Sequence, residues 1–454
     1  MAHFGVVAPA FYSHVSALSA LALALVERGH RVTFLQRPDA SAYLNDARLG
    51  FHAVGLSSHP AGSLAQSLRR AANPGGPLGL RRVILDMAAT TSMLCRELPT
   101  AFEQLGIDAV LADQMEAAGG MVAESLGLPF ISVACALPVN RERGIPLPVM
   151  PFDWGASERS LHMFEGSTRV YDWMMTPHRR AIESESERLG IPLRGALHEC
   201  LSPLAQISQT VSAFEFPRQA LPPGFHHVGP LRAASHKAPA RIEALPDIKQ
   251  DRPFIFASLG TLQGHRLDVF KRIARACRKL DAQLLIAHCG GLDARQAASL
   301  ERLGATWVCA FAPQEAAIAR ADVVISHAGL NTVMDAAAAH TPVLALPIAF
   351  DQPGVAARIR HAGVGLSASP RFTSSTMLAR HLRRLLDEPA FKQRCLPLAD
   401  GVRQAGGEVR LDLRPVPRGD GALGAEGVLH ITGALDGLDP VVALELVEDT
   451  RVGL

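Results

Sequence analysis

The stretch that decides the fold is SHAGLNTVMD at positions 326–335, which directly follows the apolar run VVI at 323–325. An apolar run that ends in a tight polar corner and continues into a helix-forming segment is typical of a parallel strand followed by a helix. Gly or Asn alone would satisfy a turn, yet this corner also carries a His and a Thr. A second polar group, DQ at 351–352, follows the next apolar run, PVLALPI. Polar side chains at neighbouring strand ends predict a binding site.

The same alternation of apolar runs and helical segments extends in both directions from this corner. Strand candidates are HFGVVAP, HRVTFLQ, AVLADQM and PFISVACAL in the first half, and FIFASLG, AQLLIAHCG and ATWVCAF in the second. Strands that alternate with helices predict parallel sheets with helices on their faces. We therefore expect an α/β protein built from two Rossmann-like, doubly wound domains that face each other across a cleft.

Composition divides the chain into four segments. Residues 232–252 are charged, contain prolines and carry few large apolar side chains, which indicates a linker. We expect one domain over 1–231 and another over 253–407. The last segment, 408–454, is rich in Gly, Asp, Arg and Val without a sustained helical period. A small appendage, a poorly ordered tail and a frame-altered end all fit this composition.

The overall composition excludes several classes of protein. The 454 residues are 48% apolar and 19% charged, with a net charge of +2, which gives no electrostatic footprint for nucleic acid. The seven cysteines are scattered without a C-x-x-C pair, so a reducing, cytoplasmic location is expected. The amino terminus lacks the basic region of a signal peptide, and no apolar run approaches the ~18 residues of a membrane span.

The corner at 326–335 suits the diphosphate of a sugar nucleotide. Asn331 or Thr332 is expected to cap the helix that follows, and a helix N-terminus offers free N–H groups to an anion. Gly329 allows a ligand to approach the backbone, and His327 can donate to a phosphate oxygen. Asp335 lies about one turn further on, where its carboxylate suits the hydroxyls of a ribose.

A second set of residues lies at strand ends in the first half. His14 follows the first strand, where a neutral imidazole is placed to act as a general base. Asp113 ends another predicted strand and can orient the imidazole, with Glu116 as the less favoured alternative. The first strand–helix turn lacks G-x-G-x-x-G, so a dinucleotide oxidoreductase is disfavoured.

Two segments carry a family resemblance: FAPQ at 311–314, and SHAGLNTVMDAAAAHTPVLALPIAFDQ at 326–352. Together they are similar to the donor-binding signature of nucleoside-diphosphate-sugar-dependent glycosyltransferases of the two-Rossmann-domain (GT-B) class. The resemblance implies that Phe311 stacks on the base, Gln314 reaches the nucleoside, His327, Asn331 and Thr332 hold the diphosphate, Asp335 binds ribose, and Asp351 and Gln352 bind the sugar. SLGT at 258–261 resembles the second phosphate loop, which places Gly260 and Thr261 near the diphosphate. His14 and Asp113 match the catalytic pair.

The implied mechanism is a single displacement with inversion of the anomeric centre. His14 removes the proton of the acceptor hydroxyl, and the nucleoside diphosphate leaves toward His327. No D-x-D occurs in the chain, so we expect no metal and no cofactor besides the sugar-nucleotide co-substrate.

Longer stretches, including FYSHV, SSHPAGSL, ESLGLPFISVACALPVNRE and FASLGTLQGHR, resemble bacterial glucosyltransferases of carotenoid diols. That resemblance implies UDP-glucose as donor, the ring hydroxyls of a carotenoid such as zeaxanthin as acceptor, and peripheral contact with the membrane that holds this acceptor. Three alternatives remain: a transferase acting on a macrolide, flavonoid or sterol; a sugar-nucleotide epimerase; and a catalytically silent binding protein.

Overall fold

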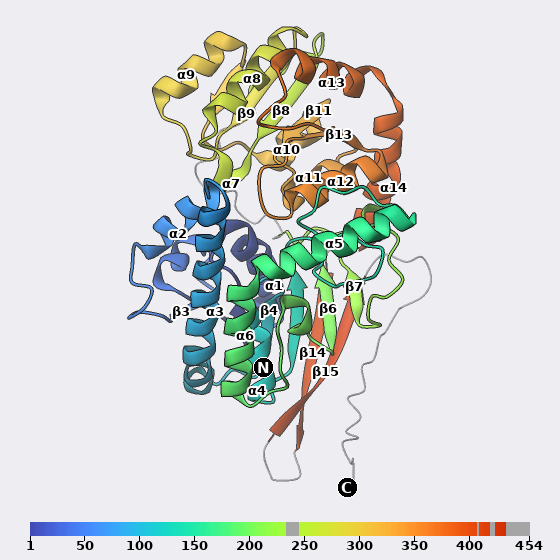
Figure 1. The fold of residues 1–454 in the computed structure, drawn as a ribbon. Helices are drawn as coiled ribbons and strands as arrows, with labels where there is room; N and C mark the ends of the chain where they lie inside the picture. The colour runs from blue at the N-terminus through green and yellow to red at the C-terminus, as the bar shows by residue number, and fades with distance from the viewer. Residues whose placement is uncertain (233–244, 406–407, 418–422, 433–454) are drawn as a thin grey trace.

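Two parallel β-sheets, each covered by helices, form the framework of the molecule (Figure 1). The structure is a computed structural model, and it describes residues 1–232, 245–405, 408–417 and 423–432. For 408–417 and 423–432 it describes the course of the backbone.

The first sheet has seven strands in the order β3-β2-β1-β4-β5-β6-β7, all paired in parallel. The strands are β1 (His3–Val7), β2 (Arg31–Gln36), β3 (Gly50–Ala53), β4 (Ala109–Asp113), β5 (Phe130–Ala134), β6 (Ala205–Ser208) and β7 (Phe225–His227). The helices are α1 (Tyr12–Glu27), α2 (Ser63–Ala72), α3 (Pro77–Leu105), α4 (Ala117–Ser125), α5 (Glu158–Met174) and α6 (Thr176–Leu189), with a short 3-10 turn η1 (Pro38–Tyr43) after β2 and another, η3 (Ser212–Phe214), after β6.

The second sheet has six strands in the order β10-β9-β8-β11-β12-β13, again all parallel. The strands are β8 (Phe254–Ser258), β9 (Gln283–Ala287), β10 (Trp307–Cys309), β11 (Val323–Ser326), β12 (Val343–Ala345) and β13 (Gly365–Ser367). The helices are α7 (Gly260–Gln263), α8 (Leu267–Arg278), α9 (Ala294–Leu303), α10 (Gln314–Arg320), α11 (Leu330–Ala338), α12 (Gln352–Ala362), α13 (Ser375–Asp387) and α14 (Ala390–Ala405). The predicted α/β class with two doubly wound sheets is confirmed.

Burial on both faces explains why the strands appear in the sequence as continuous apolar runs. Successive side chains of a strand point to opposite faces, so Phe4 and Val6 of β1 pack with α1 while Val7 packs with α3 and α4. The second sheet is buried in the same way, with Phe254 in one core and Ile255 in the other. Parallel sheets covered on both sides require this pattern.

Each sheet has one point at which the strand order reverses direction. In the first sheet this point lies between β1 and β4, and in the second between β8 and β11. Because crossover connections run to opposite sides there, the loops after the two strands separate and leave room for a ligand at the carboxyl ends.

The carboxyl ends of the two sheets face each other. The backbone N–H of Leu137, beyond β5, donates to the Oδ2 of Asp351, beyond β12, at 3.2 Å. The rings of Phe11 and Phe350 meet edge to face with centroids 5.9 Å apart. These contacts join positions more than two hundred residues apart, so the strand ends of both halves border one shared region.

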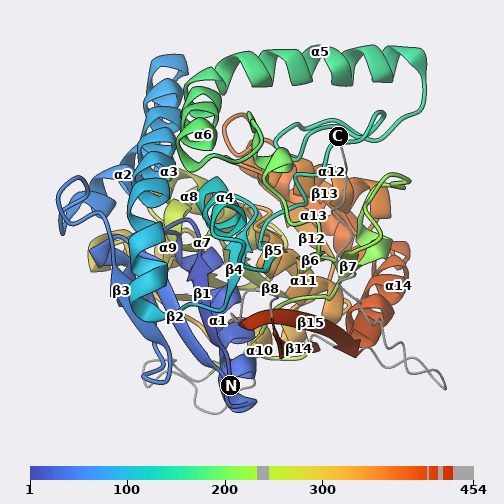
Figure 2. The same cartoon turned by 90° about the horizontal axis from the view of Figure 1, so that it is seen from below.

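The carboxy-terminal helix α14 returns to the first half. A Cβ placed on Gly401 of α14 would lie 3.3 Å from the Val211 side chain. Beyond α14, β14 (Glu408–Pro417) and β15 (Leu423–Thr432) form an antiparallel hairpin that lies beside α1 (Figure 2). The segment expected to be an atypical tail thus contains two strands, and its remaining residues, 418–422 and 433–454, lie outside the described residues.

The expected linker at 232–252 is described only in part, since 233–244 lie outside the described residues. From 245 to 252 the chain forms neither helix nor strand, and Leu245 and Ile248 pack against the core of the second sheet. Within the described residues, no helix is both long and apolar enough to cross a bilayer.

Candidate active site

The predicted site residues gather at the two points where the strand order reverses. His14 lies in the first turn of α1 after β1, and Asp113 is the last residue of β4. Gly260 follows β8, and His327 follows β11. Each sheet therefore contributes one pair of residues from its two central strand ends, which is where open α/β sheets bind ligands.

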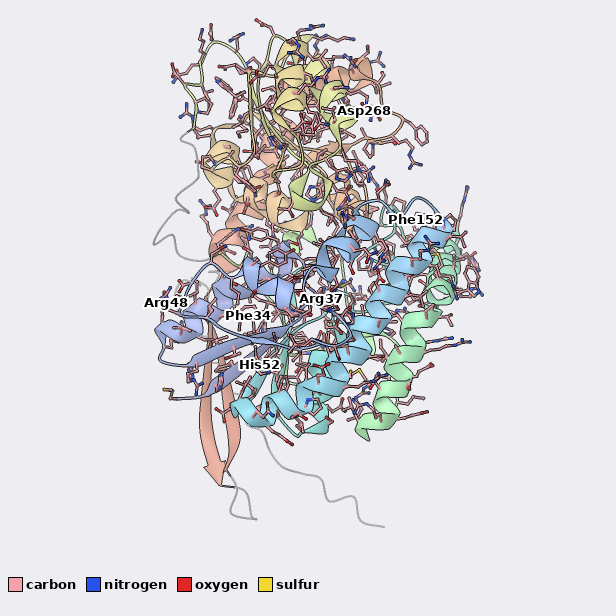
Figure 3. The ribbon with its side chains drawn as sticks, turned by 90° about the vertical axis from the view of Figure 1, so that its left-hand side faces the viewer. Phe34, Arg37, Arg48, His52, Phe152 and Asp268 are labelled. Carbon is pink, nitrogen blue, oxygen red and sulfur yellow. The ribbon has the colours of Figure 1, made fainter. Side chains whose placement is uncertain are left out.

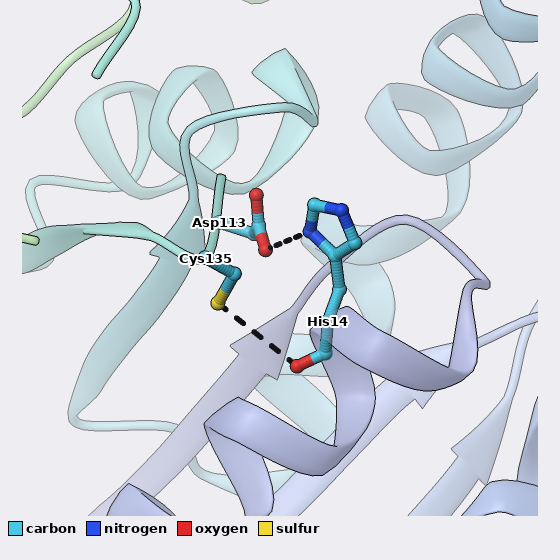
Figure 4. A group of neighbouring side chains, drawn as sticks. All are labelled: His14, Asp113 and Cys135. Atoms are coloured by element: carbon cyan, nitrogen blue, oxygen red, sulfur yellow. Dashed lines mark hydrogen bonds and ion pairs between the residues drawn. The ribbon is translucent and has the colours of Figure 1, made fainter. Parts of the chain in front are cut away.

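His14 and Asp113 form a hydrogen-bonded pair (Figure 4). The Nδ1–H of His14 donates to the Oδ2 of Asp113 over 2.7 Å, and the backbone N–H of Met115 donates to the Oδ1 of Asp113 over 2.9 Å. The carboxylate is thus fixed on both oxygens, and it fixes the imidazole in turn. The second ring nitrogen, Nε2, points away from Asp113 (Figure 4). It is left as the acceptor nitrogen of the neutral ring.

Two carboxylates set the pKa of His14. Burial alone would lower this pKa, but Asp113 and then Asp351 counteract burial and raise it above the usual 6.5. Asp351 belongs to the second half of the chain, and burial raises the pKa of its own carboxyl against the opposing effects of the Leu137 N–H and of His14. The electrostatic coupling places a residue predicted to bind the sugar close to the residue predicted to act as base.

Cys135 completes a small cluster with this pair. Its thiol lies 4.0 Å from the backbone carbonyl oxygen of His14, and ligand atoms of His14, Asp113 and Cys135 all lie within 4.8 Å of one another. Such a group has the composition of a metal site. Burial, reinforced by Asp113, raises the pKa of the Cys135 thiol well above its usual value, whereas a metal ligand must be the thiolate. The expectation that no metal is required therefore stays a prediction.

Glu116, the alternative partner for His14, makes its hydrogen bonds to other residues. Its Oε1 accepts from the Thr91 hydroxyl at 2.8 Å and from the Ala118 N–H at 3.2 Å, so it caps α4. Burial raises the pKa of Glu116 to about 7, against the hydrogen bonds that stabilise its charge. The partner of His14 is Asp113.

His327 lies between two glycines in the second half of the chain, which is called the donor half below. A Cβ on Gly260 would lie 2.7 Å from the Cε1 of His327, and a Cβ on Gly329 would lie 2.6 Å from it. Gly260 also has φ +72°, which other residues rarely adopt. Burial lowers the pKa of His327 to about 4, so the ring is neutral at pH 7, and its Nδ1 has no partner among the described residues. The two loops predicted to hold phosphate are therefore in contact through this imidazole.

The start of α11 corrects one prediction. Asn331 or Thr332 was expected to cap this helix, but the helix begins at Leu330 and its N-cap is Gly329. Ala328, with a φ of +66°, turns the chain two residues before the helix begins. Phe350, just before Asp351, has a φ of +56° as well. Left-handed backbone at a non-glycine residue costs energy and is found preferentially where a site requires it.

Several predicted donor residues are held by other side chains. The Oδ1 of Asn331 accepts from the Nε2 of Gln209 at 2.6 Å. The Oδ1 of Asp335 accepts from the Nε and Nη2 of Arg232, at 3.0 and 2.6 Å, and its Oδ2 accepts from the Nε2 of Gln314 at 3.0 Å. The carboxylate that the family resemblance assigns to ribose is thus already the acceptor of three N–H groups.

The remaining donor residues differ in exposure. Phe311 is 53% exposed and free to stack on a planar ligand. Thr261 is exposed, while Thr332 is buried. Gln352 accepts from the N–H groups of Ile348 and Ala349, both at 2.8 Å, so in this structure its carbonyl oxygen closes the loop after β12.

Sequence reasoning missed the residues that connect the two halves. Arg232 and Gln209 contact the predicted donor residues, and Arg358 of α12 is fully buried against Glu215 and the ring of Phe216. Polar residues immediately after strand-like runs, such as Gln209 in QISQ, are the one signal that was present. Nothing in the local sequence marks the other contacts.

Most of the chain matches a known family of transferases. A family model described as UDP-glucoronosyl and UDP-glucosyl transferase matches residues 5–401. The chain belongs to this family. A zeaxanthin glucosyltransferase of Pantoea ananas is 52% identical over 407 residues, covering 90% of this chain and 94% of the relative. One of Pseudescherichia vulneris is 48% identical over 411 residues, covering 90% and 96%.

Solved structures of this fold align over nearly the whole chain. The glycotransferase of kitacinnamycin superposes with a TM-score of 0.68 at 19% identity, covering 89% of this chain and 96% of that one. The glycosyltransferase VinC in complex with DTDP superposes with a TM-score of 0.61 at 21% identity, covering 88% and 95%. At this identity the likeness concerns the fold, which is the GT-B arrangement expected from the sequence.

Proposed function

We propose that this UDP-glycosyltransferase moves glucose from UDP-glucose to the hydroxyl groups of a carotenoid diol, zeaxanthin, with inversion at the anomeric carbon. The names of the two relatives at 52% and 48% identity support the acceptor and the sugar. The structural observation that carries the proposal is the His14–Asp113 pair, held where Asp351 of the donor half acts on it electrostatically.

His14 acts as the general base. Because its Nδ1–H is committed to Asp113, its Nε2 carries the lone pair that takes the proton of the acceptor hydroxyl. The imidazolium that forms is stabilised by Asp113 and by Asp351. Proton removal and attack of the oxygen on the anomeric carbon then occur in one displacement, which inverts that carbon.

The donor half binds the leaving nucleoside diphosphate. Phe311 stacks on the base, Asp335 and Gln314 bind the nucleoside, and the N-terminus of α11 with His327 receives the diphosphate. A helix N-terminus stabilises the negative charge that develops on the leaving group. The Nδ1 of His327, which has no partner among the described residues, can present an N–H to the diphosphate, and binding of the diphosphate should raise the pKa of the ring.

Gly260, Gly329, Thr261 and Asn331 shape and line the diphosphate site, with Thr332 buried behind them. In this proposal Asp351 and Gln352 bind the transferred sugar, which must sit near His14 to meet the acceptor oxygen. This placement is supported by the contact of Asp351 with the N–H of Leu137, which brings the loop after β12 against the first half of the chain, here called the acceptor half.

The proposal is tested by an acceptor panel. Purified chain is incubated with UDP-glucose and zeaxanthin dispersed in detergent, and in parallel with a macrolide, a flavonoid and a sterol. We expect glucosylation of zeaxanthin alone, or at a rate far above that of the other three acceptors. Faster transfer to another acceptor would overturn the acceptor assignment. Conversion of UDP-glucose with no acceptor present would indicate an epimerase, and binding without turnover would indicate a silent binding protein.

A further inference from the structure

One face of the acceptor half is both apolar and positively charged. Residues 47–85 contain five arginines and neither Asp nor Glu, and two of the five, Arg48 and Arg70, pair with the flanking Asp46 and Asp86. The segment forms β3, α2 and the first turns of α3. We call six exposed residues of these helices and of the loop before α2 the α2–α3 face: Leu56, Arg69, Leu78, Arg81, Arg82 and Leu85.

The helical spacing places these side chains on one side of α3. Leu78, Arg81, Arg82 and Leu85 follow the i, i+3, i+4, i+7 pattern of a single helix face. Leu78 is 79% exposed and Leu85 42%, whereas Val83 and Ile84 between them are buried. Leu56, in the loop before α2, is 66% exposed. Apolar side chains of this size rarely project into water in a row without a partner.

The arginines of the face have no acidic partners in the described part of the chain. Arg70, which is not part of the face, pairs with Asp86 at 2.7 Å and so fixes α2 against α3. No ion pair within the described residues involves Arg69, Arg81 or Arg82. Their charge is therefore available to an external anion.

The α2–α3 face lies beside the donor half. The carbonyl oxygen of Ala72, at the end of α2, accepts from the Nη2 of Arg266 at 2.8 Å. It also accepts from the Nε2 of Gln263 in α7 at 3.4 Å, and α7 begins at Gly260, which contacts His327. Figures 1 and 3 show α2 and the upper end of α3 next to α7. The face thus borders the region where both halves meet.

We propose that the α2–α3 face docks on an anionic lipid bilayer, with the leucines inserted at the headgroup boundary and the arginines on lipid phosphates. Apolar and basic residues on one helix face are the combination that binds such an interface. The proposal rests on the proposed function in one respect: an acceptor dissolved in the bilayer would reach His14 from this edge.

Another exposed apolar helix does not meet the charge criterion. Helix α5 exposes Met163, Val170 and Trp173, but it also carries Glu158, Glu165 and Asp172. Glu165 and Asp172 pair with Arg143 and Arg141, and α5 also carries Arg159 and Arg169, so acidic and basic groups are mixed on this helix. The bilayer is assigned to the α2–α3 face because the arginines of that face have no acidic partner among the described residues.

The test is co-sedimentation of the full chain with vesicles. Vesicles of phosphatidylglycerol and phosphatidylcholine are compared with phosphatidylcholine alone, at low and high salt. The expected result is binding to the anionic vesicles that weakens with salt. Arg81→Glu combined with Arg82→Glu should reduce the partition coefficient about tenfold or more, and Leu78→Gln combined with Leu85→Gln should also reduce it. Controls on the donor half, Arg295→Glu with Arg302→Glu and Phe372→Gln, should bind like the parent.

A parallel turnover assay separates this proposal from the proposed function. With zeaxanthin in detergent the Arg81→Glu, Arg82→Glu variant should match the parent, and with zeaxanthin in anionic vesicles it should be slower. If the parent chain does not turn over zeaxanthin in detergent, the proposed function is overturned but the docking proposal is not. Vesicle binding that is absent, or equal in the variant and the parent, would overturn the docking. Self-association of the parent that the Leu78→Gln, Leu85→Gln variant abolishes would assign the face to a second copy instead.

Discussion

The Nδ1 of His14 and the Oδ2 of Asp113 lie 2.7 Å apart although the two residues are 99 positions apart in the chain. They are neighbours because β1 and β4 pair in parallel and end at the same edge of the sheet. In the proposed mechanism the carboxylate selects the tautomer that leaves Nε2 free, and it stabilises the charge that the ring acquires.

The pH dependence of kcat/KM should report His14. Protonated His14 cannot accept a proton, so kcat/KM falls as the pH decreases through its pKa, which Asp113 and Asp351 hold above 6.5 against the effect of burial. Asp113→Asn removes the carboxylate that has the larger effect on the pKa of His14. It should move the acid limb to lower pH and reduce the plateau about tenfold or more. An acid limb that does not move would contradict the pairing.

The contact of Gly260 with His327 should be intolerant of a methyl group. Gly260→Ala places a Cβ 2.7 Å from the ring at a positive φ, so it should displace the imidazole and raise the KM for UDP-glucose. Gly190→Ala is the matched control, because Gly190 has φ +68° with no atom within 4 Å of its added Cβ. Equal effects of the two substitutions on KM would attribute the change to backbone strain and would contradict a role for the contact with His327.

Asp335→Ala should mainly weaken donor binding. The substitution removes the proposed ribose acceptor and leaves Arg232 without its partner. We expect the Kd for UDP-glucose, measured by calorimetry, to rise at least about tenfold, the scale of a lost hydrogen bond to a charged group. The kcat at saturating donor should change little. A large fall in kcat with an unchanged Kd would place Asp335 in the chemical step instead.

The buried ion pair between the halves should be needed for stability. Arg358→Leu leaves the buried carboxylate of Glu215 with Arg218, at 3.6 Å, as its remaining ion-pair partner among the described residues. Removing one partner of a buried ion pair typically costs about 3–5 kcal/mol, and Arg218 should keep the loss at the lower end of this range. Urea unfolding of the full chain measures the loss. Arg384→Leu removes an exposed arginine that pairs with Glu388 at 2.8 Å, and it should leave the unfolding midpoint unchanged. Similar shifts in both variants would argue against a special role for the buried pair.

Turnover should be independent of divalent metal. The Nδ1 of His14 is engaged by Asp113, and the sequence contains no D-x-D to hold a metal on the diphosphate. Treatment with EDTA followed by gel filtration should therefore leave the rate of zeaxanthin glucosylation unchanged. A loss of rate that Mg²⁺ or Mn²⁺ restores would contradict this expectation.

Local sequence was sufficient for the strands and for most of the residues at their ends. Apolar runs that stop at polar corners, as at His327, are a property of a few consecutive residues, and the rule for parallel sheets then brings the corners together. Together with the match of both residues to the catalytic pair of the family, this is why the contact of His14 with Asp113 could be predicted. Alternation of apolar and polar residues in EVRLDL, at 408–413, is a local signal for β14 that the prediction of an atypical tail does not use.

The misplaced helix cap and the contacts between the halves depend on tertiary structure. Ala328 adopts a left-handed φ that its residue type does not favour. The guanidinium of Arg232 meets Asp335 only because the end of the first half lies against α11. Long-range contacts of flexible side chains leave no periodic trace in a single sequence.

The most direct test of the central claim is the single-turnover rate of zeaxanthin glucoside formation at saturating UDP-glucose, for the parent chain and for His14→Ala. The donor Kd of both proteins is measured alongside. We predict a rate about a hundredfold or more lower for His14→Ala with an unchanged donor Kd. A variant that forms the glucoside at the parent rate would contradict the assignment of His14 as the base.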